Sequence, residues 1–167
     1  MKTEVAVIMG SKNDLEILND LFKTLNDFDV HFTARIMSAH RTPDDAAEFA
    51  KNCESNGIKV VICVAGMAAH LAGVIAAHTV IPVIGLPVAS EPFKGFDALL
   101  SMVQMPPGIP VATVTAGKAG AKNAALLAVS ILALGNPDLS SKLKDFRKQQ
   151  AETVRNADLE LQKQLAK

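Results

Sequence analysis

Apolar and polar residues alternate along the chain in blocks that predict strands and helices. The first apolar run, Val5 to Met9, is unbroken and ends at Gly10, as in a strand covered by helices on both faces. Leucine and phenylalanine side chains then recur at helical spacing as far as Leu25. We therefore expect a strand, a loop and a helix at the start of the chain.

The second expected strand has a different pattern. Apolar and polar residues alternate over 30–36, which is typical of a half-exposed strand at the edge of a sheet. Thr42 as N-cap, Pro43 at the first helical position and two acidic residues in the first turn predict a helix that starts there. This helix is expected to end near Gly57, a residue suited to a left-handed cap.

The rest of the chain repeats the alternation of strand and helix. Further strands are expected over 60–64, 80–86 and 111–114, and helices over about 70–77, 98–103 and 123–134. Such alternation predicts a parallel sheet with right-handed crossovers. A charged helix follows from Asp138, and its apolar residues are too sparse for a core helix. It either packs on a neighbouring subunit or is a solvated terminal helix.

The length and the net charge of the chain limit the number of domains and the classes of ligand to be expected. The 167 residues, 49% of them hydrophobic, suit one compact domain, with a core over about 1–135 and a helical extension over about 137–167. The 17 basic and 17 acidic residues give a formal net charge of zero. This balance argues against a nucleic-acid partner or a polybasic membrane patch and favours a small-molecule ligand.

Several features point to a cytoplasmic protein. The span Val60–Ser90 has no acidic residue, lysine or arginine, but glycines, prolines, His70 and His78 interrupt it, so two buried strands around a short helix explain it better than a membrane segment. The apolar run at the N-terminus is too short for a signal peptide. Cys53 and Cys63 lack metal-type spacing and are expected to be buried, reduced thiols.

Candidate catalytic and binding residues lie on three loops that follow expected strands: GSKND, SAHRTP and AGMAAH. In an open parallel sheet the ligand binds outside the carboxyl ends of the strands, where the strand order reverses. With a strand order of 2-1-3-4-5, all three loops meet at that edge. This convergence is what makes the loops a candidate site.

The first two loops offer groups for a phosphate and a sugar. Ser11, with the amides of the following helix, can hold a phosphate, or it is a plain turn residue or helix cap. Asp14 can accept hydrogen bonds from sugar hydroxyls, or it only stabilises the helix dipole. Arg41 carries a charged fork suited to phosphate oxygens, or it pairs at the surface with Asp44 or Asp45.

Two histidines are candidates for acid/base or binding roles. Histidine titrates near neutral pH, so His40 beside an arginine can deliver and remove a proton; the alternative is a structural histidine in a turn. His70 follows Gly66, Ala68 and Ala69, which allow a ligand to approach the backbone closely. A neutral imidazole there can orient a flat heterocycle, or it packs against a helix.

Five motifs, in order from Val5 to about Leu134, resemble one known family: GSKND, SAHRTP, AGMAAHLAG, SMVQMPPGIPVATV and GKAGAKNAALLA. The family is that of the N5-carboxyaminoimidazole ribonucleotide mutases, PurE class I, within the AIR carboxylase family. The resemblance implies an α/β fold, a flavodoxin-like three-layer αβα sandwich with a five-stranded parallel sheet of order 2-1-3-4-5 plus a C-terminal helix. It also implies an isomerase of de novo purine biosynthesis that works without cofactor, metal or ATP. Such an enzyme moves a carboxylate from the exocyclic nitrogen to carbon 4 of an aminoimidazole ribonucleotide.

The resemblance also implies roles for individual residues. Ser11 and Arg41 would bind the 5'-phosphate and Asp14 the ribose hydroxyls, while His40 would be the general acid/base and His70 would lie near the heterocycle. Other residues would line the site: Ser38, Ala39, Gly66, Ala68 and Ala69. The family forms homo-octamers whose sites draw on more than one subunit, so the segment 104–106 is expected to reach a neighbour's pocket.

The sequence departs from the family pattern at two positions and leaves two alternatives. Met67 stands where the family more often has glycine, and Ala72 where proline is usual, which bears on the shape of the third loop. The class II carboxylase, which uses free carbon dioxide, is one alternative, and Arg41 and His70 favour the mutase over it. The other is a non-catalytic flavodoxin-like module, but the chain has no Trp or Tyr for flavin stacking. The end of the third strand, 64–66, has no aspartate to accept a phosphoryl group.

Overall fold

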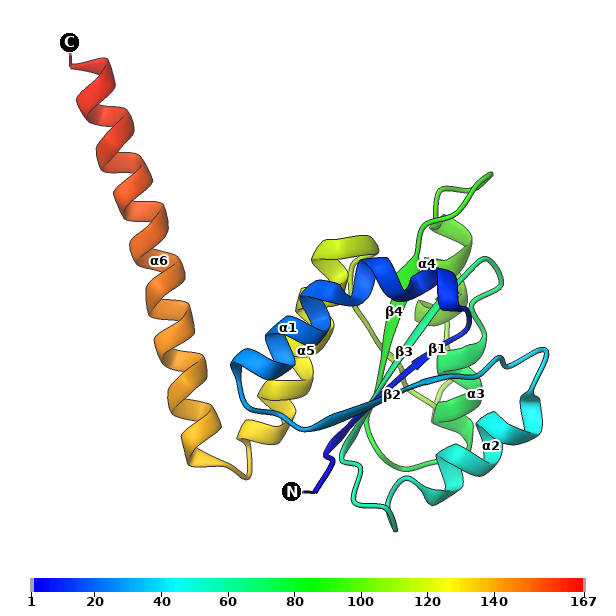
Figure 1. Ribbon diagram of the computed structural model, residues 1–167. Coiled ribbons are helices and arrows are strands. Elements are labelled where there is room, and N and C mark those ends of the chain that lie inside the picture. The colour runs from blue at the N-terminus through cyan, green and yellow to red at the C-terminus, as the bar shows by residue number, and fades with distance from the viewer. Residues whose placement is uncertain (1, 167) are drawn as a thin grey trace. The chain divides into compact units, whose positions relative to one another are not determined.

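The computed structural model describes residues 2–166 (Figure 1). The strands are β1 (Val5–Met9), β2 (Phe32–Ile36), β3 (Val60–Gly66), β4 (Val83–Val88) and β5 (Ala112–Thr113). The helices are the 3-10 helix η1 (Lys12–Leu18), α1 (Asn19–Asp27), α2 (Pro43–Asn52), α3 (Leu71–Ala77), α4 (Phe96–Val103), α5 (Gly117–Ala133) and α6 (Pro137–Leu165). The chain divides into two compact units, one that ends at Ile131 and one that begins at Leu132.

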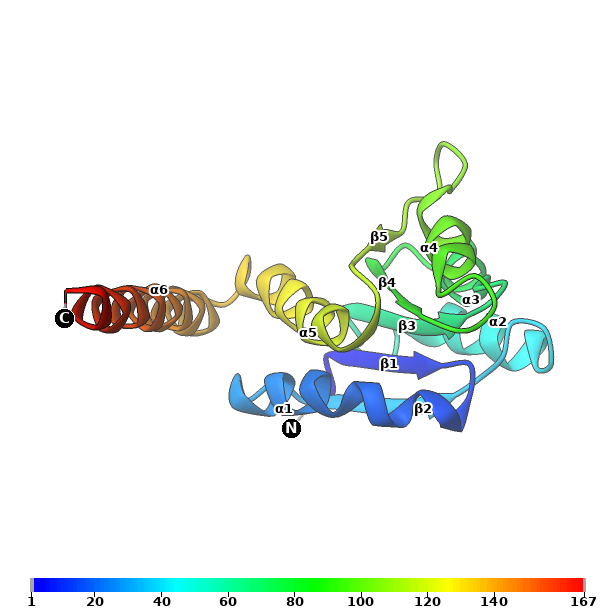
Figure 2. The ribbon, with the colours of Figure 1, turned by 90° about the horizontal axis from the view of Figure 1, so that it is seen from above.

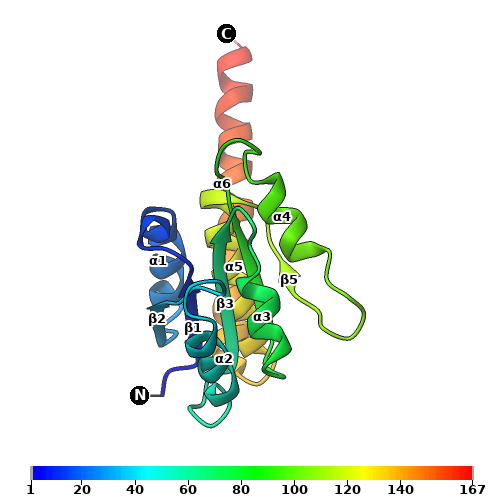
Figure 3. The same ribbon diagram turned by 90° about the vertical axis from the view of Figure 1, so that its right-hand side faces the viewer.

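The strands form a single parallel sheet in the order β2-β1-β3-β4-β5, which confirms the predicted order. Figure 2 shows β1 and β3 running in the same direction. Helices α1 and α5 lie on one face of the sheet, and α2 and α3 on the other (Figures 1 and 3). Met9, the last residue of β1, is level with Ile36 and Val64 on the neighbouring strands. The loops that follow these strands therefore leave the sheet at one edge.

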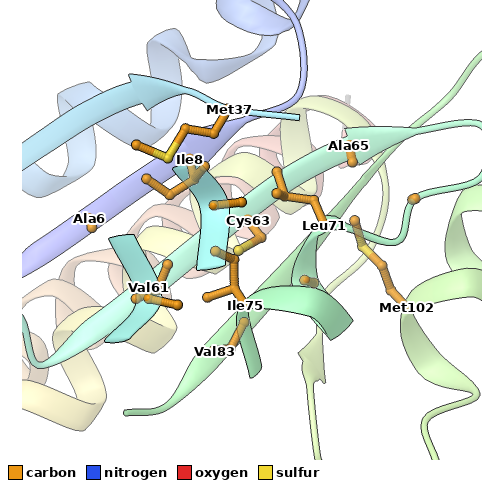
Figure 4. Packing of buried hydrophobic residues seen from close by; sticks show 14 of the residues in the cluster. Ala6, Ile8, Met37, Val61, Cys63, Ala65, Leu71, Ile75, Val83 and Met102 are labelled. Atoms are coloured by element: carbon orange, nitrogen blue, oxygen red, sulfur yellow. The ribbon is translucent and has the colours of Figure 1, made fainter. Parts of the chain in front are cut away.

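The core explains why the central strands are continuous apolar runs. All five residues of β1 are at most 2% exposed, because helices cover both faces of the strand. On the α2 and α3 side, Ile8, Cys63, Ile75 and Met102 belong to one cluster of buried side chains (Figure 4). This packing anchors the strand ends from which the loops emerge.

The two cysteines lie in this cluster as free, buried thiols, as the sequence predicts. Burial raises the pKa of the Cys53 thiol to about 11 and raises that of Cys63 further still. Both sulfurs are therefore protonated at neutral pH. They serve as small apolar packing groups.

The uncharged span 60–90 folds as predicted into two strands around a short helix. Within residues 2–166, no helix is both long and apolar enough to cross a membrane. The predicted start of β4 is wrong, because Val80 is 88% exposed and the strand begins only after Pro82. The strand also runs two residues beyond Leu86, to Val88.

Other elements also differ from the prediction. The first helical segment opens as the 3-10 helix η1 and becomes α-helical only at Asn19. Strand β2 lies at the sheet edge as expected, but Ala34 and Ile36 are exposed, so its alternating pattern does not mark a buried face. Helix α2 ends at Asn52, and the chain then continues through turns to Gly57, whose φ of 79° is in the left-handed region.

The predicted start is too late for α5 and within one residue of the observed start for α6. Helix α5 starts at Gly117, six residues before the predicted Asn123. Helix α6 starts after Asn136, whose side-chain oxygen accepts hydrogen bonds from the amides of Asp138 at 3.1 Å and Leu139 at 3.2 Å. Several apolar residues of α6 are exposed, in line with its sparse apolar pattern: Val154, Leu159, Leu161 and Leu165.

Candidate active site

The loops at the carboxyl edge of the sheet surround a cavity of about 750 Å³. The structure brings nine of the predicted site residues to its wall: Ser11, Asp14, Ser38, Ala39, His40, Arg41, Gly66, Ala68 and His70. Ala69 is not part of the wall, because it is 1% exposed and packs in the core cluster. The cavity therefore lies where the strand order reverses, as the rule for open parallel sheets requires.

The first loop is closed by a reciprocal cap. The Ser11 hydroxyl accepts a hydrogen bond from the Asn13 amide at 3.2 Å, and the Asp14 carboxylate accepts one from the Ser11 amide at 3.2 Å. Burial raises the pKa of Asp14 above its usual 3.8, and the bond from the Ser11 amide opposes this only in part. Asp14 is thus a cap and also a half-buried carboxylate at the cavity wall.

The second loop is organised around Ser38. Its hydroxyl accepts hydrogen bonds from the amides of His40 at 3.3 Å and Arg41 at 3.2 Å. Its own amide donates to the Thr42 hydroxyl at 3.0 Å. Thr42 is the N-cap residue of α2 and Pro43 its first residue, as predicted, but the Thr42 side chain makes no cap hydrogen bond and braces the loop instead. These contacts fix the backbone from which His40 and Arg41 project.

Arg41 connects two loops. Its guanidinium donates a hydrogen bond of 3.0 Å to the carbonyl of Gly10, at the end of β1. Among residues 2–166 it forms no ion pair with Asp44 or Asp45, the partners of the alternative interpretation. The remaining N–H groups of the guanidinium are available to an anion beside Ser11.

His40 and His70 lie in contact with each other at the cavity wall. The Nε2 of His40 lies 2.9 Å from the Nδ1 of His70, and the rings meet edge to face with centroids 5.0 Å apart. One N–H and one lone pair are needed for this hydrogen bond, and either ring can donate according to its tautomer. The pair therefore presents a proton carrier with a second imidazole at hydrogen-bond distance.

The third loop turns sharply after β3. Met67 has a φ of 56°, in the left-handed region where a residue other than glycine is strained, and its side chain is 62% exposed. This conformation gives a physical reason for glycine at the position. The chain keeps the loop shape with methionine, at a cost of roughly 1–2 kcal/mol.

Part of the cavity wall was not predicted from the sequence. Asn13 and Leu71 belong to it, as do the last residue of β4, Val88, and the two residues that follow it, Ala89 and Ser90. The signal for that segment was present, because a fourth parallel strand must deliver its carboxyl end to the same edge. It was overlooked because the strand was expected to end at Leu86, before the residues concerned.

A second cavity, of about 960 Å³, lies at the opposite end of β4. Its wall includes Lys51, Glu54 and His78, and the Nδ1 of His78 is 2.9 Å from the Val74 carbonyl oxygen. It lacks a counterpart of the facing imidazoles and the adjacent arginine. Within the described residues, no three His, Cys, Asp or Glu side chains gather as metal ligands. The cavity at the carboxyl edge is therefore the better candidate for chemistry.

Comparisons with known proteins agree on one family. Residues 4–153 match the family model described as AIR carboxylase. An N5-carboxyaminoimidazole ribonucleotide mutase of Pyrococcus abyssi is 54% identical over 144 residues, which are 86% of this chain and 82% of that protein. One of Brucella melitensis is 51% identical over 92% of this chain and 95% of its own length. A crystal structure of Treponema denticola PurE superposes with a TM-score of 0.85 at 30% identity, over 94% of this chain and 97% of that one.

Proposed function

Because this chain belongs to the AIR carboxylase family, we propose that it is an N5-carboxyaminoimidazole ribonucleotide mutase. The reaction converts N5-carboxyaminoimidazole ribonucleotide to 4-carboxy-5-aminoimidazole ribonucleotide, a step of de novo purine biosynthesis. Mutases about half identical over most of the chain support this choice over the class II carboxylase. The observation that carries the proposal is the His40–His70 pair, 2.9 Å apart in a cavity that Arg41 also lines.

The arrangement of loops suggests how the ribonucleotide is held. The phosphate lies between the first helical turn at Ser11 and the guanidinium of Arg41, where amides and a fixed positive charge favour an anion. Asp14 accepts hydrogen bonds from the ribose hydroxyls beside it. The imidazole ring rests against the small residues Gly66 and Ala68, within reach of both histidines.

One histidine can serve both proton transfers of the reaction. His40 as an acid protonates the carbamate nitrogen while the N–C bond breaks and carbon dioxide leaves. Carbon 4 of the electron-rich ring then attacks the carbon dioxide and forms the new C–C bond. The now neutral His40 removes the proton from carbon 4, which restores aromaticity and returns the histidine to its starting state. No metal or ATP takes part.

The cavity must retain carbon dioxide during the reaction. Carbon dioxide must stay beside the ring between its release and its recapture, because escape would leave the decarboxylated ribonucleotide. Three loops joined by hydrogen bonds, with small side chains at the third, allow close enclosure of the reacting groups. The intermediate is thereby kept at reacting distance.

We also infer a homo-octamer that works in the cytoplasm and takes neither nucleic acid nor membrane as partner. Exposed apolar side chains on and before α4 support a subunit contact there: Phe93, Phe96, Leu100 and Val103. The segment 104–106 directly after α4 is the part expected to reach a neighbour's pocket. Light scattering on the purified protein should give the octamer mass, and a monomer at working concentration would contradict this inference.

The reaction is tested with two substrates under identical conditions. Purified protein should interconvert the carbamate and carboxylate ribonucleotides in the absence of ATP. In a parallel assay, aminoimidazole ribonucleotide and bicarbonate should give much slower product formation. Efficient use of the second pair alone would identify a carboxylase, and failure with both would refute the proposed function.

A further inference from the structure

Ser90 lies at the active-site cavity but has no part in the mechanism above. It comes two residues after the end of β4, and Val88 pairs with Gly66 at the end of β3. A Cβ added to Gly66 would lie 3.7 Å from the Ser90 hydroxyl oxygen. The hydroxyl is therefore beside the backbone on which the substrate ring is proposed to rest.

The Ser90 hydroxyl has no hydrogen-bond partner among residues 2–166, and less than 1 Å² of its oxygen is exposed. A buried hydroxyl without a partner destabilises a folded protein, so such groups need an explanation. Two other buried side-chain oxygens of the described chain share this condition, Asp97 Oδ1 and Thr113 Oγ1. Neither of those two residues lines the cavity, whereas Ser90 does.

To reach a ligand, the Ser90 hydroxyl must turn from its covered position toward the cavity. The Ser90 residue is only half-buried and forms part of the wall, although its oxygen is covered. Rotation about χ1 moves the oxygen between staggered positions. Because the hydroxyl has no partner to leave, this rotation breaks no hydrogen bond within the described chain. The serine is thus free to serve a ligand.

The order of the strands indicates which part of the substrate meets Ser90. Across the sheet edge, β2 and β1 carry Arg41 and Ser11, then β3 carries the third loop, and β4 carries Ser90. With the phosphate at the first two loops and the ring over the third, the ring substituents farthest from the ribose point toward β4. Carbon 4 and the carboxyl group bonded to it in the product lie on this side of the ring. The exocyclic nitrogen, which carries the carboxyl group in the substrate, is on carbon 5 and lies nearer the ribose.

We propose that the Ser90 hydroxyl donates a hydrogen bond to the migrating carboxylate of the ribonucleotide. The inference rests on the proposed function and assigns a further substrate-binding residue to the same site. A carboxylate accepts hydrogen bonds strongly and carries the charge that makes them stronger. The serine keeps its proton throughout, so it changes no bond and holds one oxygen of the group while carbon dioxide passes from nitrogen to carbon.

The test compares two ribonucleotides that differ only in the carboxyl group. In Ser90→Ala, affinity for 4-carboxy-5-aminoimidazole ribonucleotide should fall by about 10- to 100-fold, the effect of one hydrogen bond to a charged group. Affinity for aminoimidazole ribonucleotide should stay within about twofold of wild type, since it has no carboxylate to bind. Turnover of the carboxylated substrates should fall by a similar factor in kcat/KM.

Thr113→Val is the matched control. It removes another buried hydroxyl without a partner, but from β5 and away from the cavity wall. Both affinities and the turnover should be unchanged in this variant. The unliganded Ser90→Ala protein should be at least as stable to heat as wild type, because it loses no internal hydrogen bond. Ser90→Cys, with a weaker donor, should fall between wild type and Ser90→Ala in affinity for the carboxylated ligand.

The outcomes separate this inference from the proposed function. An active wild type whose Ser90→Ala variant binds both ribonucleotides as before would overturn the role of Ser90 alone. Equal loss of affinity for both ligands would also overturn it, because the effect would then not concern the carboxylate. An inactive wild type that binds neither ribonucleotide would instead reject the proposed function.

Discussion

The contact between His40 and His70 predicts how substitutions at the two positions combine. His40→Asn removes the proposed acid/base, and one such group contributes about 10²- to 10⁴-fold to a reaction, so kcat should fall by that factor. His70→Ala removes the partner that lies 2.9 Å from the Nε2 of His40. A hydrogen bond between neutral groups contributes about 0.5–1.5 kcal/mol net, which corresponds to about 2- to 13-fold in kcat.

If His70 acts by orienting His40, the double variant should be no slower than His40→Asn alone. The interaction energy of the cycle then equals the whole effect of the His70 substitution. His70→Asn should restore part of the lost rate, because its amide group lies near the position of the Nδ1 that contacts His40. Rates are measured at saturating carbamate substrate, with ligand binding checked in each variant.

His78→Ala is the control, because this imidazole bonds the Val74 carbonyl at the other end of the sheet and should leave kcat unchanged. Losses that multiply in the double variant would show that His70 acts on the substrate independently of His40. Full activity of His40→Asn would remove His40 from the chemistry altogether. Either result would refute the reasoning from the paired imidazoles.

Two further predictions concern stability. Burial raises the pKa of Asp14 above 3.8, so the folded protein holds this proton more tightly than the unfolded chain, and stability falls as pH rises through the window just above 3.8. Asp14→Asn should lack that fall and be more stable at neutral pH in urea unfolding; an unchanged pH profile would contradict this. A Cβ at Gly120 would overlap the carbonyl oxygen of Thr115, whereas one at Gly73 meets only the flexible Met105 side chain, with its sulfur at 3.2 Å. Gly120→Ala should therefore lower the free energy of unfolding by about 3 kcal/mol or more, and Gly73→Ala should change it by no more than about 1 kcal/mol; equal losses would refute the steric argument.

The sheet was predictable because its strands are buried on both faces. An unbroken apolar run such as Val5–Met9 has few structural alternatives once it is bounded by a turn. The ends of elements were less predictable, because they depend on tertiary contacts. Val80 continues the apolar run of β4 in sequence, yet it is 88% exposed, since the strand begins beyond Pro82.

The candidate site, too, could be predicted from the sequence only in part. The sequence places His40 and His70 on loops that parallel strands must bring together, so their proximity follows from topology. The direction of the Thr42 hydroxyl toward Ser38 does not follow from topology, because a threonine before a proline equally suits a helix cap. Ser90 lacked a motif of its own, and only the cavity wall and its unpartnered hydroxyl distinguish it from other serines.

The hydrogen bonds between loops have a consequence for the thermodynamics of ligand binding. Arg41 already holds the Gly10 carbonyl, and His40 already meets His70, so the three loops are ordered before a ribonucleotide arrives. Binding then loses little conformational entropy in the protein, and the affinity reflects contacts more than the ordering of loops. In a preorganised site the loops need not close after the substrate binds, so carbon dioxide is not released into a site that is still open.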